Sequence, residues 1–147
     1  MRRDTPLRAP REFVYLRHTM SALGPLNWLA IAVGGTLGCW LRYGQTLMVQ
    51  SIWGREFPSA TLSINVIGSF LMGFLFVATT ERIDMSPALR VGILTGFLGG
   101  YTTFSTFSME TLLLVQNGAW LRALLYVVLS VALGFGGAVL GVFLARL

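Results

Sequence analysis

Residues 96–110 read GFLGGYTTFSTFSME, a stretch rich in glycine and hydroxyl residues inside an apolar part of the chain. Three glycines and five serine or threonine residues fall within its first thirteen positions. Each glycine lowers helix stability by roughly 1 kcal/mol in water, and the β-branched Thr102 and Thr103 directly follow two glycines. A continuous helix is therefore unfavourable, and the stretch predicts a helix that breaks over residues 99–103.

A break in a helix frees backbone groups, and their surroundings determine which partners these groups can bind. Lipid cannot satisfy freed backbone carbonyls and amides, so a break within a membrane has to be buried in protein or to line a polar cavity. Freed carbonyl oxygens are also hard ligands that suit a small cation. The alternative is a glycine-rich packing face whose hydroxyl groups bond back to their own helix.

Composition places this stretch in a membrane protein. The chain has 147 residues, of which 54% are hydrophobic and 12% charged, with a mean hydropathy of +0.69. An average soluble domain carries about 25% charged residues. The chain runs without a charged residue over 24–41, 57–80, 91–109 and 123–145, each near the roughly 20 residues that a spanning helix needs. The sequence predicts an all-α integral membrane protein with four transmembrane helices, at about 27–49, 58–80, 87–117 and 118–145.

The charged residues define two regions. Residues 1–19 hold five of the eleven arginines and are predicted to be a basic, mobile tail, and residues 20–147 to be the four-helix transmembrane domain. The tail suits anionic lipid headgroups but lacks the dense cluster and interleaved aromatics of a nucleic-acid-binding segment. Enzyme chemistry is not expected, because the chain has one histidine, one cysteine and no lysine for metal, thiol or phosphate sites.

Beyond the tail, the charges are nearly balanced between the two sides of the predicted bundle. Arg82, Arg90 and Arg146 would lie on one side, and Arg55 and Arg122, with or without Arg42, on the other. Cytoplasmic loops normally collect basic residues, so this balance favours insertion in both orientations, although the tail arginines favour one of them.

Polar side chains form short stripes within the apolar segments. Thr61, Asn65 and Ser69 recur every four residues, and Tyr126 and Ser130 repeat that spacing. Residues four apart share a helix face. A buried amide can simply hold two helices together, with bonds that average about 0.6 kcal/mol. The stripes favour a lined path over isolated contacts of that kind.

Two phenylalanines follow the expected break. Phe104 and Phe107 are three apart and share a face with Glu110, a spacing usually found in a core. The positive edge of an aromatic ring can also hold an anion without a full positive charge nearby. Arg42, inside the first predicted helix, either extends to the membrane interface or faces a wet cavity.

On these motifs the sequence resembles the Fluc (CrcB) family of small bacterial fluoride channels, over about residues 27–145. The resemblance is carried by GGTLG at 34–38 with Arg42, NVIGSF at 65–70 and, above all, residues 96–110. It implies an antiparallel, dual-topology homodimer in the bacterial inner membrane, with two pores and a structural sodium ion at its centre. It further implies passive export of fluoride from the cytoplasm, which lowers fluoride toxicity.

The resemblance also implies roles for single residues. The sodium ligands would be the backbone carbonyls of Gly99 and Thr102, and Arg42 would lie near an aqueous vestibule. The fluoride pore would be lined by Asn65, Phe104, Phe107, Tyr126, Ser130, Thr61, Thr106 and Glu110.

Two other functions fit parts of the pattern. A small four-helix, proton-coupled exporter of cationic compounds needs a carboxylate within the membrane, and Glu110 is the only acid in a predicted span. A structural membrane subunit would need only the glycine packing faces.

Overall fold

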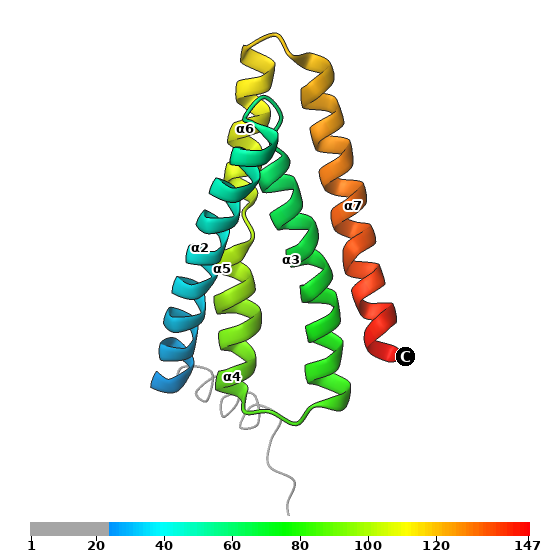
Figure 1. Ribbon diagram of the computed structural model, residues 1–147. Coiled ribbons are helices and arrows are strands. Elements are labelled where there is room, and N and C mark those ends of the chain that lie inside the picture. Colours follow the sequence, from blue (N-terminus) through cyan, green and yellow to red (C-terminus); the bar gives the residue numbers. More distant parts are fainter. Residues whose placement is uncertain (1–23) are drawn as a thin grey trace, which may run out of the picture.

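The computed structural model describes residues 24–147 and, within this range, consists of helices without a strand. The predicted tail, residues 1–19, lies outside the described residues. The helices form four rods. In Figure 1 these rods run alternately up and down, side by side, and a short turn joins the last two at the upper end. The described part of the chain is thus all-α with four rods, as the sequence predicts.

The rods differ in their regularity. The first is α2 (Pro25–Trp53), and the second is α3 (Ser59–Val77), which continues as the π-helical segment η1 (Ala78–Arg82). The third consists of α4 (Pro87–Val91), η2 (Gly92–Leu98), α5 (Gly99–Tyr101) and α6 (Phe104–Gln116). The fourth is α7 (Trp120–Arg146). The last rod begins two residues later than predicted, because Gly118 adopts a φ of 71° and turns the chain there.

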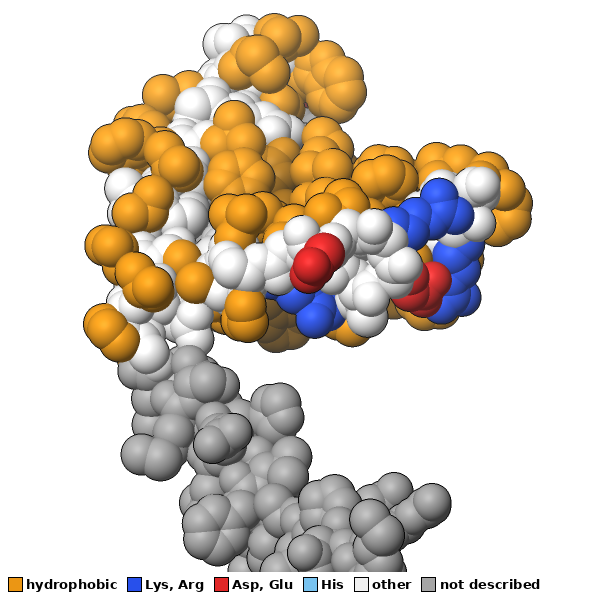
Figure 2. Space-filling model, turned by 90° about the horizontal axis from the view of Figure 1, so that it is seen from below, with side chains coloured by type: hydrophobic (Ala, Val, Ile, Leu, Met, Phe, Trp, Pro, Cys, Tyr) orange, Lys and Arg blue, Asp and Glu red, His pale blue; other side chains and the backbone are white. Residues whose placement is uncertain are grey.

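Two of the rods are long and apolar enough to cross a membrane, namely Ser59–Arg82 and Trp120–Arg146. The other two do not meet this measure, since α2 includes Arg42 and Gln45 and the third rod is divided into short segments. Large apolar side chains nevertheless face outward along the rods, for example Trp40 on α2 and Phe135 on α7. Such a surface is unfavourable in water and fits contact with lipid or another protein. Figure 2 shows hydrophobic side chains covering much of the molecule in the view onto one end.

The first and third rods touch through their backbones. A methyl group built on Gly38 of α2 would lie 2.1 Å from the carbonyl oxygen of Phe97 and 2.8 Å from the amide nitrogen of Tyr101. Only glycine permits this approach, and close approach through small residues is how helices pack in membranes. The same device joins α3 to α7, where a methyl on Gly141 would lie 2.2 Å from the carbonyl oxygen of Phe70.

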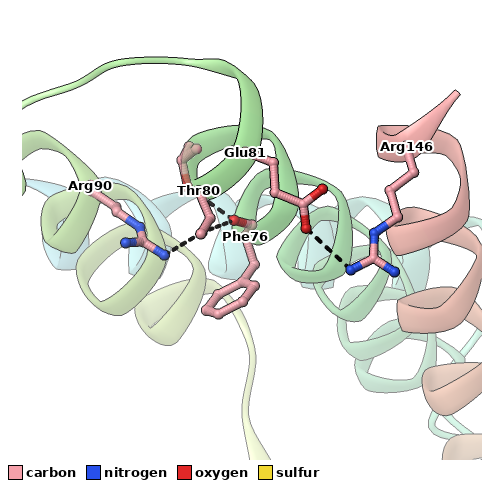
Figure 3. A network of polar contacts seen from close by, with 6 residues as sticks. Phe76, Thr80, Glu81, Arg90 and Arg146 are labelled. Carbon is pink, nitrogen blue, oxygen red and sulfur yellow. Dashed lines mark hydrogen bonds and ion pairs between the residues drawn. The ribbon is translucent and has the colours of Figure 1, made fainter.

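Polar contacts tie the helix ends together at the lower end of the bundle (Figure 3). Arg90 donates to the hydroxyl of Thr80 at 2.5 Å and lies 5.4 Å from the ring centroid of Phe76. Glu81 pairs with Arg146 at 3.2 Å, which joins η1 to the end of α7. Exposed pairs of this kind contribute at most about 1 kcal/mol, so the glycine contacts between rods matter more for the fold.

We expect Gly38→Ala to destabilise the protein, because the new methyl would meet the backbone of the third rod. Overpacking of this kind typically costs about 1–3 kcal/mol. Thermal unfolding of the purified protein in detergent measures the effect as a lower transition temperature.

Gly44→Ala provides the matched control in the same helix, since nothing lies within 4 Å of a methyl built there. This variant should unfold at the wild-type temperature or slightly above it, because alanine favours a helix over glycine by up to about 1 kcal/mol. Equal transition temperatures for the two variants would contradict the proposed backbone contact.

Candidate functional site

The third rod is interrupted between α5 and α6. Thr102 has φ −82° and ψ 160°, and Thr103 has φ −153° and ψ 119°, so both residues are extended. The interruption lies at the end of the predicted range 99–103, and residues 99–101 are still helical. Figure 1 shows it as a short, non-helical strip of ribbon about halfway along the rod.

Asn65 of α3 binds the interrupted backbone through both ends of its side-chain amide. Its Nδ2 donates to the carbonyl oxygen of Thr103 at 2.9 Å, and the amide nitrogen of Thr103 donates to Asn65 Oδ1 at 2.8 Å. The side chain therefore supplies the partners that a helix would have given this residue. One hydrogen on Nδ2 remains for another acceptor, because an amide nitrogen carries two.

The interruption also releases the two carbonyls predicted as sodium ligands. In a continuous helix the amide of Thr103 would reach the carbonyl of Gly99, but it donates to Asn65 instead. The amide of Thr106 would likewise reach the carbonyl of Thr102, but it donates to the hydroxyl of Thr103 at 3.2 Å. Two carbonyl oxygens close in sequence thus lack their helical partners.

Side chains at the start of α6 hold the interrupted backbone in place. The hydroxyl of Thr103 caps the helix and donates to the Thr106 hydroxyl at 3.0 Å, so Thr106 belongs to this cap. Thr102 donates to the carbonyl of Leu98 at 2.9 Å. Its methyl group occupies the space that a side chain at Gly68 would need, at 2.2 Å from a methyl built there.

Aromatic rings form a row beside the interruption. The ring centroids of Phe104 and Phe107 are 5.6 Å apart, and those of Phe107 and Tyr126 are 5.1 Å apart. Phe57 meets Tyr126 edge to face at 5.7 Å. Phe104 is 78% exposed, so one end of the row lies open at the surface of the protomer.

Glu110 joins two other predicted pore residues. Thr61 donates to Glu110 Oε1 at 3.0 Å, and the hydroxyl of Tyr126 donates to Oε2 at 2.7 Å. The carboxylate therefore binds both α3 and α7 from its position on α6. Each of its oxygens has a hydrogen-bond donor, which offsets part of the cost of burying it.

A hollow of about 390 Å³ adjoins the interruption, and we call it the Asn65 hollow. Its lining includes Asn65, Phe104, Phe107 and Ser130, all predicted from the sequence. The hydroxyl oxygen of Ser130 is buried and has no hydrogen-bond partner in the described part of the chain. None of the lining residues is charged.

Glu110 lines a second hollow of about 470 Å³ toward the turn after α2, which we call the Arg55 hollow. Arg122, also in its lining, pairs with Glu56 at 3.3 Å. The predicted residues thus form one group between two hollows. Its members are Thr61, Asn65, Phe104, Thr106, Phe107, Glu110, Tyr126 and Ser130.

Arg42 stands apart from this group, because it lines neither hollow and its guanidinium lies 3.7 Å from Cys39 Sγ. A contact not expected from the sequence joins the hydroxyl of Tyr101 to Gln45, which in turn donates to Ser63 at 3.1 Å. The sequence offered one indication of this contact, namely a glutamine inside a long predicted span. Ser69 also lines the Asn65 hollow, and its spacing from Asn65 was the signal for that position.

Comparison with known proteins identifies the family. Residues 29–142 match the family described as CrcB-like protein, Camphor Resistance (CrcB). The chain belongs to the CrcB family. The matched range contains every residue of the group described above, together with the interruption between α5 and α6.

Curated members of the CrcB family resemble this chain over most of its length. The Fluoride-specific ion channel FluC of Acidithiobacillus ferrooxidans is 59% identical over 116 residues, which cover 79% of this chain and 93% of the relative. The protein of the same name from a Roseiflexus species is 48% identical over 121 residues, covering 82% and 98%. That from a Hydrogenobaculum species is 45% identical over 122 residues, covering 83% and 99%.

We expect Asn65→Ala to destabilise the fold, since it removes the partners of both backbone groups of Thr103. Each unsatisfied buried group costs about 1–3 kcal/mol. Chemical or thermal unfolding in detergent measures the loss. Asn117→Ala is the matched control, because Asn117 is exposed in the turn before α7 and should change stability by less than about 0.5 kcal/mol. A wild-type stability for Asn65→Ala would contradict this role.

Proposed function

We propose that this protein is a fluoride-selective, passive channel that exports fluoride from the cytoplasm and so lowers its toxicity. The observation that supports this function is the Asn65 hollow, where a free amide hydrogen, an unpartnered Ser130 hydroxyl and two phenylalanine rings surround an uncharged space. Similar members of the family are named fluoride-specific ion channels, which supports the choice of ion. The protein is a channel and not an enzyme.

The chemistry of the hollow suits a small anion. Fluoride is compact and strongly hydrated, so a narrow path has to replace its water with compact donors such as an amide and a hydroxyl group. The ring edges of Phe104 and Phe107 add positive potential without a fixed charge that would trap the ion. Rapid conduction needs sites that attract an ion and also release it.

The path would continue from the rings to Glu110. Tyr126 contacts the ring of Phe107 and also binds Glu110, which lines the Arg55 hollow. Thr61 lies at the same carboxylate, and Thr106 at the cap of α6. An inside-negative potential would drive fluoride outward, at roughly 2.3 kcal/mol per charge for every 100 mV. No separate energy source is needed, which distinguishes this mechanism from a proton-coupled exporter.

A second copy of the chain would complete the path. The exposed Phe104 leaves the Asn65 hollow open on one side of the protomer. Of the six arginines of the described residues, Arg42 lies within α2, Arg82, Arg90 and Arg146 lie toward one end, and Arg55 and Arg122 lie toward the other, so the two ends carry nearly equal numbers. This supports an antiparallel, dual-topology homodimer in the bacterial inner membrane, with each protomer crossing the membrane four times and two pores per dimer.

The released carbonyls fit a structural sodium ion. Gly99 and Thr102 each offer a hard oxygen ligand without a helical partner, and two copies would supply four such oxygens. Bound there, sodium would neutralise the partial negative charge of the carbonyls and hold the two interrupted rods together. The vestibule role of Arg42 stays a prediction, since its contact with Cys39 lies outside both hollows.

The central test is fluoride efflux from proteoliposomes that contain the purified protein, with no proton gradient. We expect fluoride to leave down its gradient, and chloride, as the control anion, to be retained because it is too large for the path. A fluoride-selective electrode records the release. Efflux that occurs only with a proton gradient would support an exporter, and the absence of any ion flux would support a structural subunit.

Phe104→Ile and Phe107→Ile should each lower fluoride efflux while the protein keeps its wild-type elution volume. Isoleucine fills similar space but has no positive ring edge, and a loss of roughly 1.4 kcal/mol of anion stabilisation corresponds to about tenfold. Phe143→Ile is the matched control, since Phe143 is exposed on α7 and lines neither hollow. Unchanged flux in both test variants would remove these rings from the pore.

A further inference from the structure

A third hollow, of about 660 Å³, lies at the lower end of the bundle, and we call it the Arg90 hollow. Its walls come from η1, the connection that follows it, α4 and η2. It shares no lining residue with the Asn65 hollow or the Arg55 hollow, so the proposed pore gives it no role. Both η1 and η2 are π-helical, a rare geometry that is frequent at functional sites.

Arg90 of α4 is held in place by α3 and its continuation. Its Nη2 donates to the hydroxyl of Thr80 at 2.5 Å, and that hydroxyl donates to the carbonyl oxygen of Phe76 at 2.6 Å. The guanidinium also lies 5.4 Å from the ring centroid of Phe76 (Figure 3). A guanidinium carries five N–H donors, and the bond to Thr80 uses one of them. Arg90 therefore offers positioned donors to a further acceptor.

The carboxylates near Arg90 pair neither with it nor with Arg82. Glu81 pairs instead with Arg146 of α7, at 3.2 Å. Asp84 and Arg82 both line the hollow, yet neither takes part in a hydrogen bond or an ion pair among the described residues. The hollow thus contains two arginines without a carboxylate partner in that part of the chain. Arginine binds phosphate particularly well, because its planar fork of donors matches two phosphate oxygens.

The hollow lies at the end of a rod that can cross a membrane. Arg82 is the last residue of the apolar stretch Ser59–Arg82, which places the hollow near the surface of a bilayer. The ring of Phe76 lies further along this rod toward its centre and is 52% exposed, so apolar surface begins directly beside Arg90. Figure 2, which views this end, shows charged side chains with hydrophobic ones around them. A ligand that fits both features has an anionic head and an apolar body.

We propose that the Arg90 hollow binds the phosphate group of an anionic phospholipid, for which phosphatidylglycerol serves as the probe. Arg82 and Arg90 would donate to the phosphate oxygens, and the acyl chains would lie against Phe76. Basic pockets between spanning helices bind anionic headgroups in the same way. Asp84 lines the hollow as well and would weaken the binding by repulsion. The inference needs a protein that lies in a membrane, but it does not depend on which ion the protein conducts.

The test measures lipid binding to the full-length protein by native mass spectrometry, in titrations with phosphatidylglycerol and phosphatidylcholine. We expect the wild type to bind phosphatidylglycerol several-fold more tightly. Arg82→Gln and Arg90→Gln should each weaken this binding by about fivefold and leave phosphatidylcholine unaffected, since each removes one charge that attracts an anionic lipid. Arg82→Gln breaks no contact within the described residues, so misfolding would not explain its effect.

Two further variants separate the site from a general effect of charge. Arg55→Gln is the matched control, because Arg55 is exposed at the opposite end and has no ion pair among the described residues. It makes the same change in net charge and should keep the wild-type affinity for phosphatidylglycerol. Asp84→Asn should strengthen the binding, because it removes a negative charge from the lining of the hollow.

Equal wild-type affinities for the two lipids would overturn the proposal, as would equal losses in Arg82→Gln and Arg55→Gln. Inorganic phosphate at millimolar concentration tests the source of the phosphate group. We expect it to leave the bound phosphatidylglycerol in place, because a free ion gains nothing from the apolar surface at Phe76. Displacement of the lipid would mean that the site takes a free anion, and the assignment to a lipid would fail. Fluoride efflux is a separate measurement, so its absence would overturn the proposed function alone.

Discussion

The pairing of the Asn65 amide with the backbone of Thr103 is the interaction on which the site depends. An interrupted helix exposes backbone donors and acceptors that lipid cannot satisfy, so the interruption persists only where protein groups take their place. Asn65 does this with bonds of 2.8 and 2.9 Å, as a neighbouring strand would in a sheet. Because one side chain serves both backbone groups, α3 fixes the point at which α6 begins. The phenylalanines of α6 are thereby placed beside the amide that holds them.

The interruption also requires close packing on its other side. Gly38 brings the backbone of α2 against Phe97 and Tyr101, immediately before the extended residues. Gly68 makes room for the methyl of Thr102 on the opposite side. The glycines therefore do more than permit helix contact. They allow α2 and α3 to pack against the part of the third rod that has the lowest helix propensity. A rod that is poor as an isolated helix becomes well defined inside the bundle, because tertiary packing outweighs intrinsic propensity.

Local chemistry in the sequence was enough to predict the four helices, a break within residues 99–103 and the polar stripe of Thr61, Asn65 and Ser69, whereas the pore roles of the residues around the Asn65 hollow came from the family resemblance and stay predictions. Glycine followed by β-branched residues weakens any helix, and a four-residue spacing puts Thr61 and Asn65 on one face whatever their partners are. The partner of each group could not be predicted in this way, since it depends on how the rods turn about their axes. The sequence left Asn65 as either a pore donor or a link between helices. Its hydrogen bonds to Thr103 show the link and use one of its two amide hydrogens, whereas the role as a pore donor stays a prediction. The π-helical segments and the bond from Tyr101 to Gln45 likewise depend on packing between rods.

The polar atoms of the site thus fall into two sets. Some bond to other protein groups and hold the structure, and others have no protein partner. The hydroxyls of Thr103 and Thr106 bond to each other in the cap of α6. Those of Thr61 and Tyr126 donate to the carboxylate of Glu110. These bonds rigidify the walls. The hydroxyl of Ser130 has no partner among the described residues, and it lines an uncharged hollow together with Ser69. If the hollow collapsed, its unpaired donors would still lack acceptors. The hollow therefore favours a bound species, a guest, that accepts hydrogen bonds. Under the proposed function, rigid walls set the size of that guest, and the absence of lysine and arginine from the lining lets it leave again.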